Sequence, residues 1–264
     1  FEALVARGAA RLVDNGVSAD TRVIGLLRRS TESVAAILAV SRAGGAIVPV
    51  DPDYPADRRS FMVRDSKTLH AVCSDPSDVP SDGFLWSTTD SLFAEENVPA
   101  CPDDGGWVVP LGCTAYVTYT SGTTGRPKGV QVTRRGYANI TNELVRAYRA
   151  DGDARVLAFA SPSFDASMLE LGLAFGSGGA LVVVPPGVVG GTELATLLRR
   201  HDVTHCFLTP SVLSTLSAAD LVPGDPVLLS ALGVGGENFG TDLLDSIAPG
   251  RTVINIYGPT ETAI

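Results

Sequence analysis

Short apolar segments alternate with helical patterns along the whole chain, and this alternation constrains the fold more than any other feature. It predicts an α/β fold with mostly parallel β-sheets covered by helices. Buried strands are predicted at residues 22–27, 46–50, 71–74, 114–120, 156–159, 180–184, 205–208, 228–234 and 252–257. Helices are predicted at residues 1–12, 30–41, 167–175, 193–201, 210–218 and 241–247, and a short one begins at Asp57.

Small and polar residues mark where several of these elements begin or end. Gly16 is predicted to stop the first helix, and Ser30 is predicted to cap the second. Asp57 is predicted to cap the short helix that follows the double-proline turn at residues 51–55. The Pro-, Asp- and Gly-rich stretch 75–106 is predicted to be mostly surface connection, with one strand near residues 84–86.

The composition excludes some classes of protein. A formal net charge of -9 argues against a surface that binds nucleic acid, which is usually basic. No apolar run is long enough to span a bilayer, so no membrane partner is expected. The four cysteines are Cys73, Cys101, Cys113 and Cys206; they lack paired metal-ligand spacing and are predicted to be free buried thiols in a reducing cytoplasm.

Both ends of the sequence resemble the interior of a domain. Phe1 stands inside an amphipathic helical pattern, and Ile264 follows a strand and a Gly-Pro turn without a closing element. We therefore expect the chain to be a fragment.

A candidate phosphate-binding loop follows the strand at 114–120. It combines hydroxyl side chains with two glycines, and Lys128 stands close by; its residues are Thr120, Ser121, Gly122, Thr123, Thr124 and Gly125. Glycines let backbone N–H groups approach an anion, while hydroxyls and a lysine add donors and charge. A Walker A loop is excluded because Pro127 stands where that motif has glycine. An ordinary hairpin turn is the alternative interpretation of these residues alone.

The full string YTSGTTGRPKGV, residues 119–130, resembles the signature loop of the adenylate-forming superfamily. This superfamily includes acyl-CoA synthetases, luciferases and the adenylation domains of nonribosomal peptide synthetases. The segment SRAGGAIVPVDPDY, residues 41–54, resembles an early segment of the same family whose role is mainly structural.

The segment Phe164-Asp165-Ala166-Ser167 with Glu170 resembles the FDxSxxE motif of peptide-synthetase adenylation domains. The spacing of Ser167 and Glu170 also predicts a capping box at a helix start. A carboxylate at Asp165 suits that place because the helix dipole favours negative charge there. The resemblance implies that Asp165 binds the α-ammonium group of the substrate.

Two further segments resemble the nucleotide site of the family. Residues 233–237 (GVGGE), with Gly235, Gly236 and Glu237, resemble the segment whose backbone lies against adenine. Residues 255–261 (NIYGPTE) resemble the NxYGPTE motif. That resemblance implies that Asn255 bonds the adenine amine, Tyr257 stacks on the base, Thr260 contacts the α-phosphate and Glu261 holds Mg²⁺.

The resemblance implies ATP-dependent activation of an α-amino acid to aminoacyl-AMP with release of pyrophosphate. The amino acid would then be loaded onto a peptidyl carrier protein with phosphopantetheine, and the resemblance implies a small accessory activator protein as a further partner. Lys128, Thr260 and Glu261 would be the catalytic residues. The family's C-terminal subdomain, which supplies a further lysine, is absent from these residues, so we expect poor catalysis by this chain alone. Residues 1–110 would form a first α/β region, and residues 111–264 would hold the phosphate loop and the substrate pocket.

The specificity pocket implied by the resemblance consists of Asp165, Ala166, Leu169, Phe207, Gly233, Gly235, Ile256 and Ile264. Apart from Asp165 this set has no ionisable side chain, so a charged substrate side chain would be buried without a partner. Its two glycines lack side chains and are therefore expected to leave the pocket deep. An aliphatic or aromatic amino acid is therefore expected.

Two alternatives of different kinds remain open. A fatty or aryl acyl-CoA synthetase of the same superfamily would leave Asp165 without an ammonium partner. A non-catalytic nucleotide-binding or scaffold module would have no need of the intact motifs.

Overall fold

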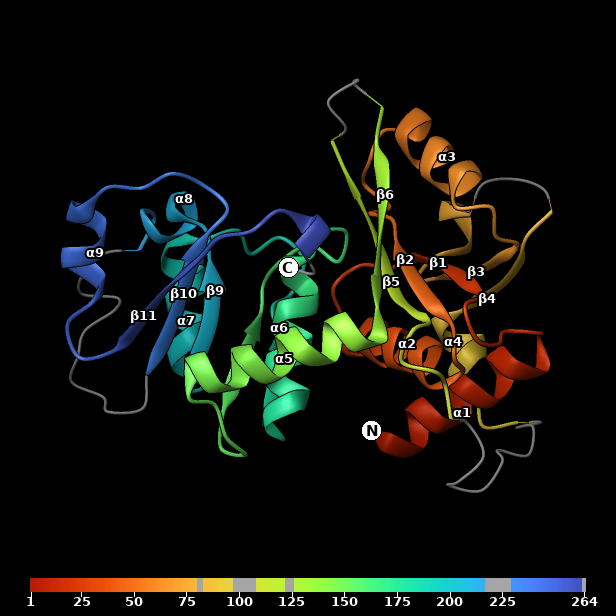
Figure 1. Cartoon of the computed structure of the whole chain (residues 1–264), viewed down its shortest axis with the longest axis horizontal. Coiled ribbons are helices and arrows are strands. Elements are labelled where there is room, and N and C mark those ends of the chain that lie inside the picture. Colours follow the sequence, from red (N-terminus) through yellow and green to blue (C-terminus); the bar gives the residue numbers. More distant parts are fainter. Residues whose placement is uncertain (80–82, 97–107, 122–125, 217–228, 263–264) are drawn as a thin grey trace. The chain divides into compact units, whose positions relative to one another are not determined.

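The computed structural model describes residues 1–79, 83–96, 108–121, 126–216 and 229–262. The chain forms two compact units. Unit 1 comprises Phe1–Tyr137 with Pro162–Phe164, and unit 2 comprises Ala138–Ser161 with Asp165–Thr262. The predicted α/β class is confirmed, and each unit is built around its own sheet (Figure 1).

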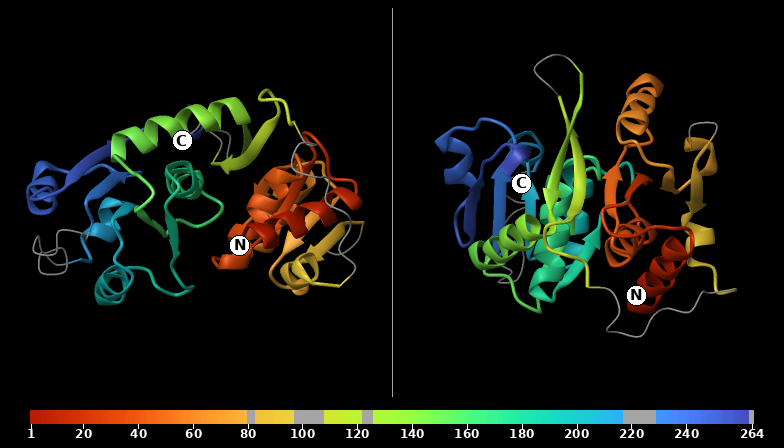
Figure 2. Two further views of the ribbon diagram at one scale, coloured as in Figure 1. Left: turned by 90° about the horizontal axis from the view of Figure 1, so that it is seen from below. Right: turned by 45° about the vertical axis from the view of Figure 1, so that its right-hand side comes forward.

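Unit 1 contains a six-stranded sheet with the order β4-β3-β1-β2-β5-β6. Its neighbouring strands are parallel except for the antiparallel pair β5 and β6, which run side by side as a hairpin (Figure 2). The strands are β1 (Arg22–Leu26), β2 (Ala46–Pro49), β3 (His70–Cys73), β4 (Leu85–Thr88), β5 (Thr114–Thr120) and β6 (Lys128–Thr133). The helical segments are α1 (Glu2–Asp14), α2 (Thr31–Arg42), α3 (Ala56–Asp65), α4 (Thr89–Phe93) and the 3-10 turn η1 (Pro76–Asp78).

The helix ends of unit 1 test the predicted caps. Ser30 caps α2 as predicted, because its side chain accepts a hydrogen bond from the Ser33 amide at 3.1 Å. Gly16 follows α1 with φ +92°, a left-handed conformation that suits glycine and ends the helix. The prediction for Asp57 is wrong. Pro55 is the N-cap of α3, and Asp57 lies inside the first turn, where its charge faces the positive end of the helix dipole.

The described residues 83–96 of the predicted surface connection hold two regular elements. The strand predicted near residues 84–86 is present as β4, and α4 follows it directly. Leu92 and Phe93 of α4 are buried, and Arg11 of α1 donates hydrogen bonds to the carbonyl oxygens of Leu92 and Ala94 at 2.9 and 2.8 Å. Gly8 permits this packing, since a Cβ atom there would lie 2.7 Å from Phe93.

Unit 2 contains a five-stranded parallel sheet with the order β11-β10-β9-β7-β8. The strands are β7 (Arg155–Ala158), β8 (Ala180–Val183), β9 (His205–Leu208), β10 (Ala231–Gly235) and β11 (Thr252–Ile256). The helical segments are α6 (Ala166–Ser177), α7 (Gly191–Arg200), α8 (Pro210–Leu213), α9 (Thr241–Ile247) and the 3-10 turn η3 (Thr260–Thr262), while α5 (Arg134–Tyr148) begins in unit 1 and continues into unit 2. The predicted strands and helices of this half are confirmed, although α8 ends at Leu213, before the predicted residue 218.

The two faces of this sheet carry separate cores. On one face, Leu144 and Tyr148 of α5 and Leu169 and Leu173 of α6 pack against the strands. We call this group the α5–α6 cluster; its strand residues include Val156, Phe207, Ala231, Ile254 and Ile256. The other face packs against α7, and its strand residues include Leu157, Cys206, Leu208, Leu232 and Val234. Neighbouring strand residues therefore alternate between the two cores.

Two expectations from composition concern membrane-spanning segments and free thiols. Among the residues that the structure describes, no helix is both long and apolar enough to cross a bilayer. Cys73 and Cys206 are free and buried as predicted, whereas Cys113, which directly precedes β5, is free but only half-buried. Cys101 lies outside the described residues.

Candidate functional site

The candidate phosphate loop joins the two strands of the β5–β6 hairpin. Thr120 at the end of β5 pairs with Lys128 at the start of β6, so the hairpin interpretation describes the backbone on both sides of the loop. Thr120 is half-buried, while Ser121 and Lys128 are exposed. Gly122, Thr123, Thr124 and Gly125 lie outside the described residues.

Tyr119 anchors the strand that leads into this loop. Its hydroxyl donates a hydrogen bond to the Asp65 carboxylate of α3 at 2.8 Å. Burial, together with this bond to a negative group, raises the pKa of Tyr119. Tyr119 therefore ties β5 to α3 as a neutral phenol, and its role within the signature is to position the strand.

Asp165 and Thr260 come together although they belong to different motifs. Asp165 is the N-cap residue of α6, and its side chain makes no capping bond to the helix. Its Oδ2 atom instead accepts a hydrogen bond from the Thr260 hydroxyl at 2.5 Å. Both side chains are half-buried. The residue predicted to bind an ammonium group and the residue predicted to contact a phosphate are thus neighbours.

The capping box predicted for Ser167 and Glu170 is wrong. The helix begins at Ala166, so Ser167 is already inside it and does not occupy the N-cap. Glu170 is only 2% exposed, and its Oε1 atom accepts hydrogen bonds from the amides of Phe159 and Ala160, both at 3.0 Å. These amides follow β7 directly, so the carboxylate supplies the acceptor that the end of the strand needs.

The described residues of the predicted pocket lie along the α5–α6 face of the sheet. Leu169 and Phe207 are members of the α5–α6 cluster, and Ala166 and Ile256 pack against it. Gly233 and Gly235 are both buried in β10. Ile264 lies outside the described residues.

The two glycines do not leave the open depth that the sequence led us to expect. A Cβ atom at Gly233 would lie 1.8 Å from the hydroxyl oxygen of Tyr148, so that side chain occupies the space. A Cβ atom at Gly235 would lie 2.1 Å from the carbonyl oxygen of Ile256, so close approach of β11 requires glycine there. Sequence reasoning missed Tyr148 because it missed α5, although Ile140, Leu144 and Tyr148 repeat at four-residue spacing.

The predicted adenine segments leave the sheet from adjacent strands. β10 and β11 are parallel, with Val234 opposite Asn255 and Gly235 opposite Ile256, so both segments begin at the same carboxyl edge. Ligands of open α/β sheets bind at such edges. Tyr257 is 95% exposed, which leaves its ring free of protein cover, and Asn255 is exposed beside it.

Glu237 has a side-chain role that the sequence did not predict. Its carboxylate accepts hydrogen bonds from the Ser211 amide at 3.0 Å and the Ser211 hydroxyl at 2.7 Å. Ser211 lies in the first turn of α8. Glu237 thus fixes the segment after β10 to the start of α8, and Gly236 before it adopts φ +83°.

The metal prediction rests on one side chain. Glu261 is exposed in η3, next to Thr260. Across the described parts of the chain, no group of three or more His, Cys, Asp or Glu side chains is arranged to hold a metal ion. A single protein carboxylate is enough for Mg²⁺ only where substrate phosphates and water supply the other ligands of the ion.

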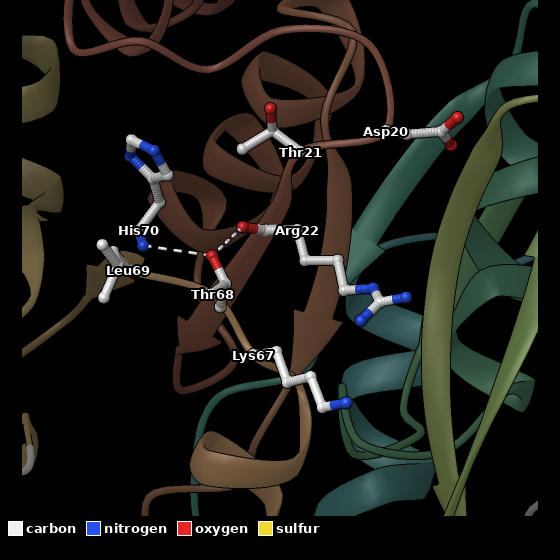
Figure 3. A pocket seen from close by; sticks show the side chains of 7 residues that line it. All are labelled: Asp20, Thr21, Arg22, Lys67, Thr68, Leu69 and His70. Carbon is white, nitrogen blue, oxygen red and sulfur yellow. Dashed lines mark hydrogen bonds between the residues drawn. The ribbon is translucent and has the colours of Figure 1, made fainter.

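A separate hollow lies at the amino-terminal ends of β1 and β3. Its volume is about 310 Å³, and Figure 3 shows the side chains that line it: Asp20, Thr21, Arg22, Lys67, Thr68, Leu69 and His70. Thr68 accepts a hydrogen bond from the His70 amide at 3.1 Å and donates one to the Arg22 carbonyl oxygen. The candidate phosphate loop follows the opposite, carboxyl end of β5 in the same sheet, so this hollow belongs to a different edge.

Comparison with known proteins supports the motif resemblances. Residues 1–264 match the family described as AMP-binding enzyme. The chain is 43% identical over 258 residues to CymA of Salinispora arenicola, a probable non-canonical nonribosomal peptide synthetase. The aligned residues cover 98% of this chain and 3% of that protein. This chain is 39% identical to novobiocin biosynthesis protein H of Streptomyces niveus, over 98% of this chain and 44% of that protein. The chain therefore spans less than half the length of these relatives.

Solved structures share the fold. The nonribosomal peptide synthetase FmoA3 in its AMPPNP-bound form superposes with a TM-score of 0.84 at 26% identity, over 97% of this chain and 28% of that one. The N-terminal subdomain of Klebsiella oxytoca NpsA superposes with a TM-score of 0.81 at 23% identity, over 95% of this chain and 62% of that one.

Proposed function

This chain belongs to the AMP-binding enzyme family, and within it to the adenylation domains of nonribosomal peptide synthetases. From this membership we propose that the chain activates an α-amino acid with ATP. The products would be aminoacyl-AMP and pyrophosphate. The position of Asp165 carries this proposal. It places a carboxylate at the start of α6, hydrogen-bonded to Thr260 of the nucleotide motif.

Asp165 would hold the amino acid by its α-ammonium group. The carboxylate has two oxygen atoms; Oδ2 accepts from Thr260, and a carboxylate oxygen has more than one acceptor site. An ammonium group beside it would be neutralised, and the substrate carboxylate would remain free to attack the α-phosphorus of ATP. Holding the two reactants in this orientation accounts for much of the rate that such a step needs.

Two sets of residues would bind the nucleotide. Thr120 to Gly125 and Lys128 would bind the β- and γ-phosphates, and Thr260 would contact the α-phosphate. Asn255 and Tyr257 would bind adenine beside the backbone of Gly235, Gly236 and Glu237. Glu261 would hold Mg²⁺, which supplies charge neutralisation to the phosphates when it is bound.

The substrate side chain would be uncharged. Leu169, Phe207 and Ile256 supply an apolar lining on the α5–α6 face, and a charged group placed there would lose its hydration without gaining a partner. We therefore propose an aliphatic or aromatic amino acid.

A carrier protein would receive the product. NpsA–ThdA of Klebsiella oxytoca, an artificially fused adenylation–PCP di-domain, shares this fold with a TM-score of 0.86. By analogy, we propose a phosphopantetheinyl carrier protein as the partner of this protein.

ATP–pyrophosphate exchange on the natural full-length protein, over a panel of amino acids, tests the proposal. We expect exchange that depends on an added amino acid and that Asp165→Ala abolishes. Full activity of Asp165→Ala, with exchange supported by carboxylic acids lacking an amino group, would favour an acyl-CoA or aryl-CoA synthetase. The absence of measurable ATP affinity would favour the non-catalytic alternative.

A further inference from the structure

The hydroxyl of Tyr148 is a polar group without a partner in a buried place. Tyr148 is 1% exposed and ends α5. Among the residues that the structure describes, none forms a hydrogen bond with this hydroxyl. A buried hydroxyl that lacks a partner destabilises a fold, because it loses its hydrogen bonds to water and gains none in the protein. Phenylalanine would fill almost the same volume without that loss, so the hydroxyl needs another explanation.

The surrounding structure fixes where this hydroxyl points. The chain turns immediately after Tyr148, with Arg149 at φ +55°, and the Ala150 amide donates to the Val145 carbonyl oxygen at 3.0 Å. The ring packs in the α5–α6 cluster with Leu169 and Phe207. Its hydroxyl oxygen lies 1.8 Å from the position that a Cβ atom of Gly233 would take.

The neighbours of Tyr148 coincide with the proposed substrate pocket. Leu169, Phe207 and Gly233 all belong to that pocket, and Ile256 packs against the same cluster. These neighbours have no polar side-chain atoms, so the hydroxyl of Tyr148 is a polar group in an apolar lining. Because burial raises the pKa of Tyr148 well above its ordinary value, the hydroxyl stays protonated and keeps its hydrogen for donation.

We propose that Tyr148 is a specificity-determining residue whose hydroxyl forms a hydrogen bond with an uncharged polar group on the side chain of the amino-acid substrate. This inference rests on the proposed function and narrows it. The preferred substrate has an apolar frame that carries a hydroxyl or carboxamide group. A site that keeps a polar group for its substrate also rejects the analogue that lacks the matching group, because the site's own group then stays unpaired.

Pairs of amino acids with matched shape test this inference by ATP–pyrophosphate exchange on the natural full-length protein. The pairs are tyrosine with phenylalanine, threonine with valine, and glutamine with methionine. We expect the wild-type protein to prefer the polar member of at least one pair by tenfold or more in kcat/KM. Tyr148→Phe should lower kcat/KM for that member by tenfold or more, mainly through KM, and leave its apolar partner within twofold. Tyr116→Phe, the same change at a buried tyrosine of unit 1, should leave both values unchanged.

The outcomes separate this inference from the proposed function. Exchange that prefers the apolar member of every pair, or an equal loss for both members in Tyr148→Phe, would overturn the role of Tyr148 alone. A Tm of Tyr148→Phe several degrees below wild type would show that the hydroxyl supports the fold, which also overturns it. If no amino acid supports exchange by the wild-type protein, the proposed function fails, and the role of Tyr148 fails with it.

Discussion

The carboxylate of Asp165 accepts a hydrogen bond from the hydroxyl of Thr260 at 2.5 Å. The first residue precedes α6 and the second opens η3, so the bond joins two segments that are distant in sequence. Under the proposed function, the same bond places the group that binds the amino acid beside the group that contacts the α-phosphate. The two substrates would then meet at one pair of side chains.

We predict that Asp165 and Thr260 are energetically coupled. Hydrogen bonds to charged groups contribute about 1.5–3 kcal/mol, and partial exposure of both residues reduces this to about 1 kcal/mol. A double-mutant cycle of Asp165→Asn and Thr260→Val, measured by chemical denaturation, should therefore give a coupling of that size. Thr260→Ser keeps the hydroxyl and serves as the control. Additive effects of the two changes would show that the bond does not form in solution.

Alanine at the two glycines of β10 should have different consequences. At Gly233 the added methyl group meets the end of the Tyr148 side chain, whereas at Gly235 it meets the backbone of β11. We expect a loss of about 1–3 kcal/mol in the free energy of unfolding for Gly233→Ala and a larger loss for Gly235→Ala. Tyr148→Phe should restore part of the stability of Gly233→Ala only. Equal rescue of both variants would contradict the contacts described above.

Glu170 should be needed for stability more than for chemistry. Its carboxylate is the acceptor for two backbone amides after β7. Glu170→Ala removes that acceptor in a buried place, and we predict a loss of about 3 kcal/mol in the free energy of unfolding. Glu170→Gln keeps one oxygen acceptor and should lose less. Thermal and chemical denaturation of the two variants provide the measurement, and equal stabilities would argue against this role.

Removal of the contact between Glu237 and Ser211 should weaken the start of α8. Capping interactions of this kind contribute about 0.5–2 kcal/mol. Glu237→Ala removes both hydrogen bonds to the carboxylate, whereas Ser211→Ala keeps the one from the amide but also removes the 3.0 Å contact between the Ser211 and Thr209 hydroxyls. Because hydrogen bonds to a carboxylate are stronger than one between hydroxyls, the first change should destabilise more. Chemical denaturation ranks the two variants. The reverse ranking would show that Glu237 contributes little.

The thiols should differ in reactivity and in their effect on pH stability. Burial, with nearby Asp78 and Asp75, raises the pKa of Cys73 from an ordinary 9.0 to about 11. The neutral thiol therefore favours the folded state fully below pH 9, and this contribution is lost as the pH rises toward 11. Iodoacetamide at pH 8 should modify half-buried Cys113 before Cys73, as mass spectrometry would show. A Cys73→Ala variant should lose less stability between pH 9 and pH 11 than wild type does.

The regular elements of unit 2 could be predicted from sequence because each depends on local pattern. β9 and β11 are short runs rich in apolar residues, and α7 combines an apolar stripe with charged residues on its other side. The segment of α5 is more polar, with several charged and amide side chains, so its apolar stripe is easily overlooked. β6 was not predicted for another reason. Its first residues belong to the signature motif, which was interpreted as a ligand-binding loop and not as a strand.

Contacts between distant residues could not be predicted in this way. The spacing of Ser167 and Glu170 predicts a local capping bond, but the Glu170 carboxylate accepts a hydrogen bond from the Phe159 amide at the end of β7. The spacing of residues in β10 likewise cannot show that Tyr148 lies against Gly233. Motif resemblance identified candidate residues such as Asp165 and Thr260 separately, and only the fold shows that they are bonded to each other.

The sheet of unit 2 separates the proposed pocket side from the side that packs on α7, and adjacent residues of one strand serve opposite sides. Under the proposed function, a substitution at Phe207 or Gly233 alters the amino acid that is accepted, while Cys206 and Leu232 continue to hold the scaffold. Diversification of the peptide product during evolution then requires changes in only one of the two layers. An engineer who wishes to reassign the incorporated building block can randomise that layer and leave the other untouched.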